Sequence, residues 1–291
     1  MSILVTGSTG RIGSHVVQQL AASGADVRAL TRAPEKANFP AGVAAVRGDL
    51  LDAHAMRQAL DGVKTLFLLV SNAPDELTQA INTLGLARLA GVQGIVYLSV
   101  TRSSVFTDVS HFTAKHAVER MIEQFDLPAT VLRPSYFFQN DATLEGPLTR
   151  AGLYVSPVGS KGVSMIDVRD IADAAVIELL RRDRASMALP RVSYELSGPD
   201  GLTGTSLAAI WAQVLGREVH YAGDDLEAFE GAVSARAPAW LAYDLRAMMH
   251  RYQADGAVGT PADLDRLTTL LGRPPRTYLD FARETAAAWK A

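Results

Sequence analysis

The nine residues "VTGSTGRIG", Val5 to Gly13, place three glycines at intervals of three, directly after the apolar run "SILV". The segment after them has the apolar spacing of a helix. Where a strand enters a helix in this way, Gly7 permits a sharp turn, Gly10 lets a phosphate approach the main chain, and Gly13 lets the helix pack tightly. The helix N-terminus would present unpaired N–H groups to a pyrophosphate. The stretch therefore predicts a dinucleotide site; a purely structural turn is the alternative.

Short apolar runs and helical patterns alternate through the first half of the chain. Six runs are expected to form strands: residues 2–7, 26–32, 43–49, 65–71, 94–100 and 129–135. Their nearly continuous apolar character suits a parallel sheet that is buried on both faces. One intervening helix has Asp52 as its expected N-cap and a stop signal at Gly62. The alternation predicts an α/β fold with a doubly wound parallel Rossmann sheet.

The character of the chain changes after about residue 197, where a helix-rich tail begins. We expect residues 1–197 to form the NAD(P)-binding domain and residues 198–291 to form a smaller lobe on the substrate side. Residues 136–165 are expected to contribute to that lobe. The boundary is placed near Ser197 to Gly201, where "GPDG" opens the helix-rich tail.

Composition excludes several classes of function. The formal net charge of −3, from 28 basic and 31 acidic residues, offers no broad basic face, so no direct nucleic-acid binding is expected. The chain has no cysteine, which rules out disulfides and thiol chemistry. No histidine has metal-ligand spacing, so no metal is expected. Without a signal peptide or a long apolar run, we expect a cytoplasmic protein that does not contact membranes. A monomer and a homodimer both remain open.

The end of the second expected strand favours one dinucleotide over another. NAD-binding folds usually carry an acidic residue there, which accepts hydrogen bonds from the ribose. Here the strand ends in Thr31 and Arg32, with Lys36 close behind. A guanidinium can grip a 2′-phosphate that a carboxylate would repel. The pattern predicts NADP(H) in preference to NAD(H), with a solvated basic loop as the alternative. Asp49, after the third strand, is expected beside the adenine or in a turn.

Several motifs together resemble one family. They are "VTGSTGRIG", "LTRAPEK", "GDLLD", "HFTAKHAVE", "LRPSYFFQN", "MIDVRDIADAA" and the tail segment "LTTLLGRPPRTYLDFARE". This combination is similar to the NmrA-like group of atypical short-chain dehydrogenase/reductases, and the resemblance spans nearly the whole chain. The group includes NADPH-dependent quinone and triphenylmethane reductases and isoflavone-reductase-like enzymes. It also includes redox-sensing regulators that bind the cofactor without turnover, and a shared fold does not decide between these functions.

The stretch "SHFTAKHAVER" (110–120) carries the expected catalytic residues, His111 and Lys115. They lie four residues apart and so on one face of a helix. The wider superfamily has Tyr-x-x-x-Lys, whereas this chain keeps the lysine and has histidine in place of the tyrosine. The resemblance implies that Lys115 reaches the nicotinamide ribose. His111 could donate a proton near neutral pH. A solvated helix face is the alternative for both residues.

The expected cofactor groove combines the glycine loop with the ends of the strands. Aromatic residues after "LRPS" could press on the nicotinamide or on a planar substrate, although such runs are often core. The expected cofactor-binding residues are Gly7, Thr9, Gly10, Arg11, Ile12, Gly13, Thr31, Arg32, Lys36, Asp49, Leu50, Leu69, Val70, Ser71, Ser99, Val100, Lys115, Pro134, Tyr136 and Phe137.

The sequence therefore predicts an NADP(H)-dependent oxidoreductase of a small molecule, a planar conjugated acceptor such as a quinone. The absence of the tyrosine suits such an acceptor, because the anion formed from a quinone is already delocalised. The rival hypothesis is a non-catalytic NADP-binding sensor that acts through a protein partner.

Overall fold

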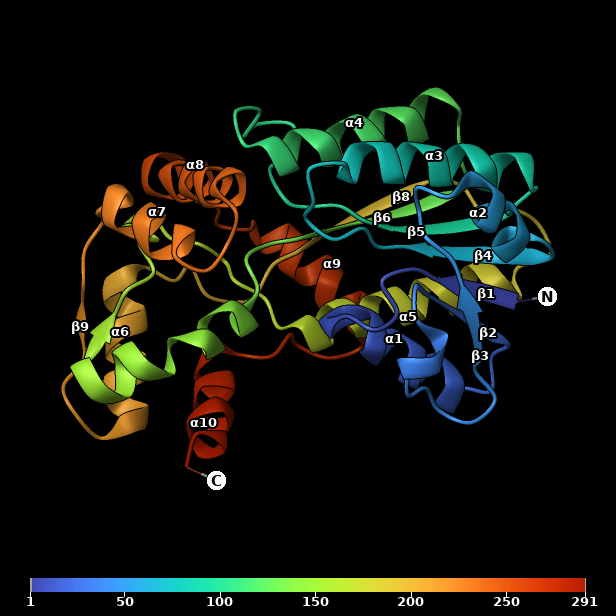
Figure 1. Cartoon of the computed structure of the whole chain (residues 1–291). Helices are drawn as coiled ribbons and strands as arrows, with labels where there is room; N and C mark the ends of the chain where they lie inside the picture. The colour runs from blue at the N-terminus through green and yellow to red at the C-terminus, as the bar shows by residue number, and fades with distance from the viewer. Residues whose placement is uncertain (1, 291) are drawn as a thin grey trace. The chain divides into compact units, whose positions relative to one another are not determined.

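The computed structural model describes residues 2–290, and its centre is a seven-stranded sheet with the order β3-β2-β1-β4-β5-β6-β8 (Figure 1). The pairs from β3 through to β6 are parallel. The strands are β1 Ser2–Val5, β2 Val27–Thr31, β3 Ala44–Arg47, β4 Val63–Leu68, β5 Gly94–Leu98, β6 Ala129–Pro134 and β8 Val192–Leu196. The chain winds outward from β1 to β3 and then returns to start β4 on the other side of β1. This reversal is the topological switch point of a doubly wound sheet.

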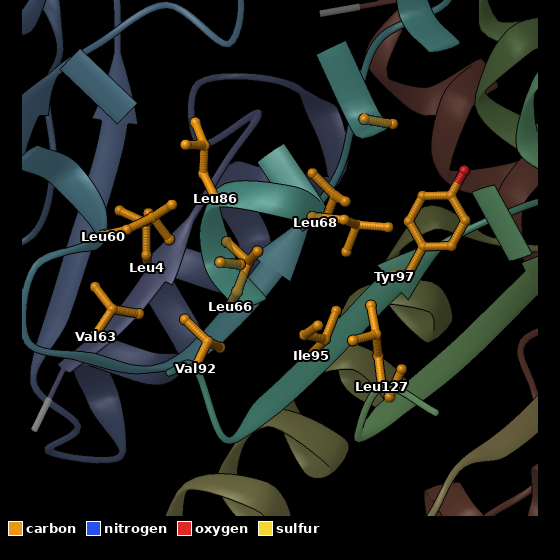
Figure 2. Packing of buried hydrophobic residues seen from close by; sticks show 14 of the residues in the cluster. Leu4, Leu60, Val63, Leu66, Leu68, Leu86, Val92, Ile95, Tyr97 and Leu127 are labelled. Carbon is orange, nitrogen blue, oxygen red and sulfur yellow. The ribbon is translucent and has the colours of Figure 1, made fainter. Parts of the chain in front are cut away.

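Helices cover both faces of this sheet: α2, α3 and α4 lie on one face, and α1 and α5 lie on the other (Figure 1). They are α1 Arg11–Ala22, α2 Ala53–Leu60, α3 Glu76–Leu89, α4 Ser110–Gln124 and α5 Val168–Arg184. Figure 2 shows how strand and helix side chains meet in the core, with Leu60 of α2 beside Leu4 of β1. The expected N-cap of α2 is confirmed, because the Asp52 carboxylate accepts the His54 and Ala55 N–H groups at 2.9 and 3.0 Å.

The doubly wound parallel α/β fold is confirmed, and all six expected strands are present. The seventh strand, β8, was not predicted. Its sequence "VSYEL" is mostly half-buried, and only Leu196 is fully buried. An edge strand of this kind lacks the continuous apolar run that identifies a strand buried on both faces.

The chain divides into two compact units, each of which is discontinuous in sequence. The first runs up to Val100 and includes Ala114–Arg133 and Arg169–Tyr194. The second is built from Thr101–Thr113, Pro134–Val168 and the chain from Glu195 onward. A domain boundary near residue 197 stays a prediction.

The second compact unit is rich in helices, as expected for the C-terminal part. Its helices after β8 are α6 Gly204–Leu215, α7 Leu226–Ser234, α8 Ala239–Asp255, α9 Pro261–Leu271 and α10 Tyr278–Ala288. Two short parallel strands, β7 Leu153–Tyr154 and β9 His220–Tyr221, pair with each other. Short helical turns occupy Pro34–Lys36 in the first unit and Phe138–Leu144 and Pro147–Ala151 in the second. No helix within residues 2–290 is long and apolar enough to cross a membrane.

A buried polar network lies in the core of the second unit. The Asp141 carboxylate accepts the hydroxyl groups of Tyr154 and Tyr278 at 2.8 and 2.6 Å. The Tyr278 oxygen in turn accepts the indole N–H of Trp211 at 2.9 Å. Burial raises the pKa of Asp141 to about 6, although both tyrosine hydrogen bonds act in the opposite direction. The protonated acid is therefore favoured in the folded state more than in the unfolded chain.

This shift makes stability depend on pH. Between about pH 4 and 6 the folded protein binds more protons at Asp141 than the unfolded chain does, so stability falls as pH rises through this window. Asp141 makes its full contribution to the free energy of unfolding below pH 4, and roughly 2 to 3 kcal/mol of that free energy is lost by pH 7. We expect Asp141→Asn to remove this component. Urea unfolding of both proteins between pH 4 and 7 measures it, and parallel stability curves would contradict the assignment.

Candidate functional site

A groove of about 840 Å³ runs across the carboxyl ends of β1 to β4, entirely within the first compact unit. This edge of the sheet, at the switch point, is where doubly wound folds bind their ligands. The lining residues come from the glycine loop, the ends of β2, β3 and β4, and the start of α3. They are Gly7, Thr9, Gly10, Leu30, Thr31, Arg32, Ala33, Lys36, Ala37, Gly48, Asp49, Leu50, Leu51, Leu69, Ser71, Ala73, Asp75 and Gln79. Ten of these were expected to bind cofactor, and the α3 residues were not.

The three glycines of the loop are required for different reasons. Gly7 has a φ of +60°, and a Cβ there would lie 2.5 Å from a methyl group of Leu69. A Cβ on Gly13 would lie 2.1 Å from the carbonyl oxygen of Gly7, so any side chain would push α1 away from the loop. At Gly10 the only atom within 4 Å of a Cβ, apart from chain neighbours, is that same carbonyl oxygen, at 3.3 Å. Gly10 therefore presents open main chain to the groove.

Two hydroxyl groups fix the loop to its neighbouring strands. The Thr6 hydroxyl donates to the Leu69 carbonyl at 2.8 Å and accepts the Leu69 N–H at 2.8 Å. The Ser8 hydroxyl donates to the Leu30 carbonyl at 2.7 Å. Both side chains are buried. Neither residue was predicted, although Thr6 directly before the first glycine and Ser8 directly after it are small hydroxyl residues at the turn.

The start of α1 is suited to an anion. Gly10 is the N-cap and contributes no side chain to the first N–H groups, and the first turn contains no acidic residue. The positive end of the helix dipole thus meets the groove without an acidic side chain in its own first turn. A phosphate placed beside Gly10 would receive these N–H groups.

A basic rim closes the groove at the end of β2. Arg32 and Lys36 both line the groove and are exposed. The nearby acid, Glu35, is 2.8 Å from Arg47 in an ion pair, and no ion pair joins Glu35 to Arg32 or Lys36 among the described side chains. Asp49 lines the groove and also accepts the Leu51 N–H at 3.0 Å. The rim thus offers two cations to an anionic group of a ligand in the groove.

Lys115 is held by an acidic residue that the sequence analysis did not identify. It lies on α4, and its ammonium group forms an ion pair with Glu76, the first residue of α3. Both side chains are largely buried. Neither Lys115 nor Glu76 is among the residues that line the groove, but Asp75, the N-cap of α3, and Gln79 of its first turn do line it. The pair therefore lies next to groove-lining residues rather than in the lining itself.

A second buried carboxylate, Glu119, lies on α4 one turn after Lys115. Glu119 accepts hydrogen bonds from the Ser99 hydroxyl and from the Arg133 guanidinium, at 3.1 Å from Nε and 2.6 Å from Nη2. The Ser99 side chain is therefore used inside the protein and does not line the groove. His111, Lys115 and Glu119 follow one another at intervals of four, so one stripe of α4 carries all three.

His111 is paired with Asp244 of α8, both in the second compact unit. Nδ1 of His111 is hydrogen-bonded to one Asp244 oxygen, and the other oxygen lies 3.4 Å from the His111 backbone nitrogen. Burial acts to raise the pKa of Asp244, but the hydrogen bonds and charge of His111 outweigh it and lower the pKa. An ionised Asp244 fixes the proton of the ring on Nδ1 and leaves Nε2 as the second nitrogen. Nothing near residue 244 in the sequence indicated this partner, 133 positions away.

The remaining expected residues lie outside the groove lining. Ile12 and Val70 are buried in the core, Gly13 packs against the loop, Arg11 is exposed, and Val100 is half-buried. Their side chains therefore do not line the groove, although the backbone N–H groups of the α1 start remain available to a phosphate.

The aromatic run after β6 lies in the second compact unit. Pro134 is buried. Tyr136 and Phe137 are half-buried, and the Tyr136 ring meets Tyr252 edge-on at 6.2 Å. Phe138, which was expected to extend the aromatic surface, instead packs in the core against Tyr278 and Phe281. A helical turn begins at Phe138, which turns its ring inward.

The groove, the glycine loop and the switch point together define a dinucleotide-binding α/β protein. The model of the NmrA-like family matches residues 1–270, and the chain belongs to this family. Within residues 2–290, no three histidine, aspartate or glutamate side chains gather as a metal site would require.

Three similar proteins illustrate the family. The chain is 30% identical to an NAD(P)H azoreductase of Xenophilus azovorans over 99% of each chain. The triphenylmethane reductase of Citrobacter sp., solved in complex with NADP(H), is 26% identical with a TM-score of 0.83, over 98% of this chain and all of that one. The NADPH-dependent quinone oxidoreductase QOR2 of Escherichia coli, complexed with NADPH, has a TM-score of 0.84 over 97% and 99% of the two chains. At 24% identity it shows the shared fold.

Proposed function

We propose that this protein is an NADP(H)-dependent oxidoreductase that reduces a planar, conjugated small molecule. The observation that carries the proposal is the groove itself, with open main chain at Gly10 and two cations at Arg32 and Lys36. The relatives named above that share 26 to 30% of its residues are reductases that use NAD(P)H or bind NADP(H).

The residues of the groove fit the parts of NADP(H). The N–H groups at the start of α1 would hold the pyrophosphate, and Arg32 with Lys36 would hold the 2′-phosphate. Lys115, with three ammonium donors, would reach the nicotinamide ribose. The buried and incompletely paired carboxylate of Glu76 beside Lys115 also suits a polar ligand at this end.

Bound NADPH supplies a hydride, and reduction of a quinone to the hydroquinone requires one further proton from elsewhere. His111 is placed on α4 one turn before Lys115, and its Nε2 can carry that proton because Nδ1 is engaged with Asp244. The ionised Asp244 stabilises the imidazolium before the transfer. Residual exposure of the His111 side chain, 12%, allows the proton to be replaced from solvent.

The acceptor is proposed to be delocalised rather than a simple ketone. An acceptor of this type, such as a quinone or an azo or triphenylmethane dye, can accept hydride before it is protonated. Such chemistry depends less on a strong, fixed proton donor than carbonyl reduction does. The names of the azoreductase and the triphenylmethane reductase agree with this class.

The proposal is tested by following NADPH oxidation with a panel of quinones, azo dyes and triphenylmethane dyes. Turnover with at least one of these acceptors, faster with NADPH than with NADH, is the expected result. Tight binding of NADPH without oxidation by any acceptor would instead favour a sensor that acts through a protein partner.

His111→Phe is expected to lower kcat and to leave the affinity for NADPH nearly unchanged, because the proton donor is lost and the cofactor contacts remain. Asp244→Asn should lower kcat by a smaller factor and alter the dependence of the rate on pH, because the imidazolium loses its counter-charge. Rate measurements between pH 5 and 9 check both variants. Wild-type pH–rate profiles in both would show that the pair only joins α8 to α4.

A further inference from the structure

Glu76 is a buried carboxylate between two residues of the groove lining, Asp75 and Gln79, and neither the sequence motifs nor the role expected for Lys115 accounts for it. It begins α3, and its residue is only 4% exposed. Its neighbours Asp75 and Gln79 line the groove, and the Gln79 amide donates to Asp75 at 2.8 Å. An acidic residue in the first turn of a helix is ordinarily exposed and interacts with the helix dipole. Glu76 instead turns inward toward Lys115 of α4.

The hydrogen bonding of Glu76 is incomplete. Oε1 accepts the Lys115 ammonium group, whereas Oε2 is buried and has no hydrogen-bond partner among residues 2–290. Glu119, the other buried carboxylate on this stripe, receives donors from both Ser99 and Arg133. A buried carboxylate oxygen without a donor is costly, and each such exception calls for an explanation. The protein thus satisfies one of the two carboxylates fully and leaves a free acceptor on the other.

The charges at the two ends of the groove indicate which part of a ligand belongs at Glu76. Arg32 and Lys36 form a rim with excess positive charge, which suits phosphate. Lys115 and Glu76 form a pair with no net charge, and the Glu76 carboxylate would repel a phosphate. A donor and a free acceptor side by side suit a neutral group that both accepts and donates hydrogen bonds, such as the two adjacent hydroxyls of a ribose.

We propose that Glu76 is a cofactor-binding residue that holds the nicotinamide ribose jointly with Lys115. The ammonium group donates to one ribose hydroxyl while keeping its bond to Oε1, since it has three N–H groups and one is used by Glu76. Oε2 accepts the O–H of the adjacent hydroxyl. This inference rests on the proposed function, because it requires that the groove bind NADP(H).

The test compares three ligands by isothermal titration calorimetry. NADP⁺ contains the complete cofactor, and 2′-phospho-ADP-ribose lacks only the nicotinamide. Adenosine 2′,5′-bisphosphate also lacks the second ribose and the phosphate that joins it to the rest of the cofactor. Glu76→Met, which removes both oxygens, is expected to weaken NADP⁺ and 2′-phospho-ADP-ribose roughly ten- to hundredfold, the effect of a charge-assisted hydrogen bond. Adenosine 2′,5′-bisphosphate should bind with unchanged affinity. Thr78→Ala, an exposed change in the same turn of α3, is the matched control and should leave all three affinities unchanged.

A second set of variants separates direct binding from mere positioning of Lys115. Removing Glu76 alone leaves the Lys115 charge buried without its partner, which can destabilise the fold. Thermal melting therefore checks that Glu76→Met is folded. If this variant does not fold, Glu76→Gln is used in its place. In a double-mutant cycle, Glu76→Met should weaken NADP⁺ further in a Lys115→Met background. No further loss in that background would overturn the proposal, because Glu76 would then act only through Lys115.

Two other results would also overturn it: unchanged affinity for all three ligands in Glu76→Met, or an equal loss for all three. If wild-type protein binds neither NADP⁺ nor adenosine 2′,5′-bisphosphate, the proposed function itself fails together with this inference. Wild-type binding with an unaffected Glu76→Met variant rejects the inference alone.

Discussion

Gly10→Val is expected to fold like the wild type and to bind NADPH at least roughly a hundredfold more weakly, because its side chain fills the path of the pyrophosphate. The fold should persist, since among residues 2–290 an added Cβ meets closely only the Gly7 carbonyl oxygen, at 3.3 Å, and a shift of a few tenths of an ångström relieves that contact. Calorimetric titration measures the affinity, and circular dichroism with thermal melting verifies the fold.

The neighbouring glycine gives a contrasting result for the same type of change. Gly13→Val should destabilise the protein itself, because a Cβ there lies 2.1 Å from the Gly7 carbonyl oxygen. Gly85→Val is the matched control, since a Cβ at this α3 glycine meets no atom of residues 2–290 within 4 Å apart from the backbone of its own helix and its chain neighbours. If Gly10→Val binds NADPH as tightly as Gly85→Val does, the phosphate does not lie at Gly10.

Arg32→Asp is expected to reverse the cofactor preference. The change removes a guanidinium that can grip the 2′-phosphate and adds a carboxylate that repels it, while the same carboxylate can accept the ribose hydroxyl of NADH. The ratio of NADPH to NADH affinity should fall by roughly a hundred- to a thousandfold, or about 3 to 4 kcal/mol.

The control for the change in charge is Arg236→Asp, an exposed substitution in the second compact unit. It should leave both affinities unchanged. Equal affinities of the wild type for NADPH and NADH would show that Arg32 and Lys36 form only a solvated basic rim.

The fold could be predicted from the sequence because its signals are local. Buried parallel strands such as β4 and β5 are continuous apolar runs, and the glycine loop lies where a strand enters a helix. Strand β8 was not predicted, because its burial is set by neighbours distant in sequence rather than by its own composition.

In the candidate site, too, residues with a local sequence signal could be predicted, and residues that depend on a distant partner could not. Residues in the loops that begin where a strand ends, such as Gly10, Arg32 and Leu69, were predicted and do line the groove. Glu76 and Asp244 were missed because each acts through a partner on another helix, 39 and 133 positions away. A single sequence does not indicate which acidic residue will meet Lys115 or His111. The family was predicted from its motifs and is confirmed by the match over residues 1–270.

Transfer of a hydride from NADPH distinguishes a reductase from a protein that merely binds the cofactor. The most direct measurement is a single turnover in a stopped-flow instrument, with the absorbance of the reduced nicotinamide followed after mixing enzyme, NADPH and a quinone or azo acceptor. If the protein transfers this hydride, the absorbance decays, and it decays more slowly with NADPH deuterated at C4 of the nicotinamide. Tight NADPH binding with constant absorbance for every acceptor in the panel would contradict hydride transfer.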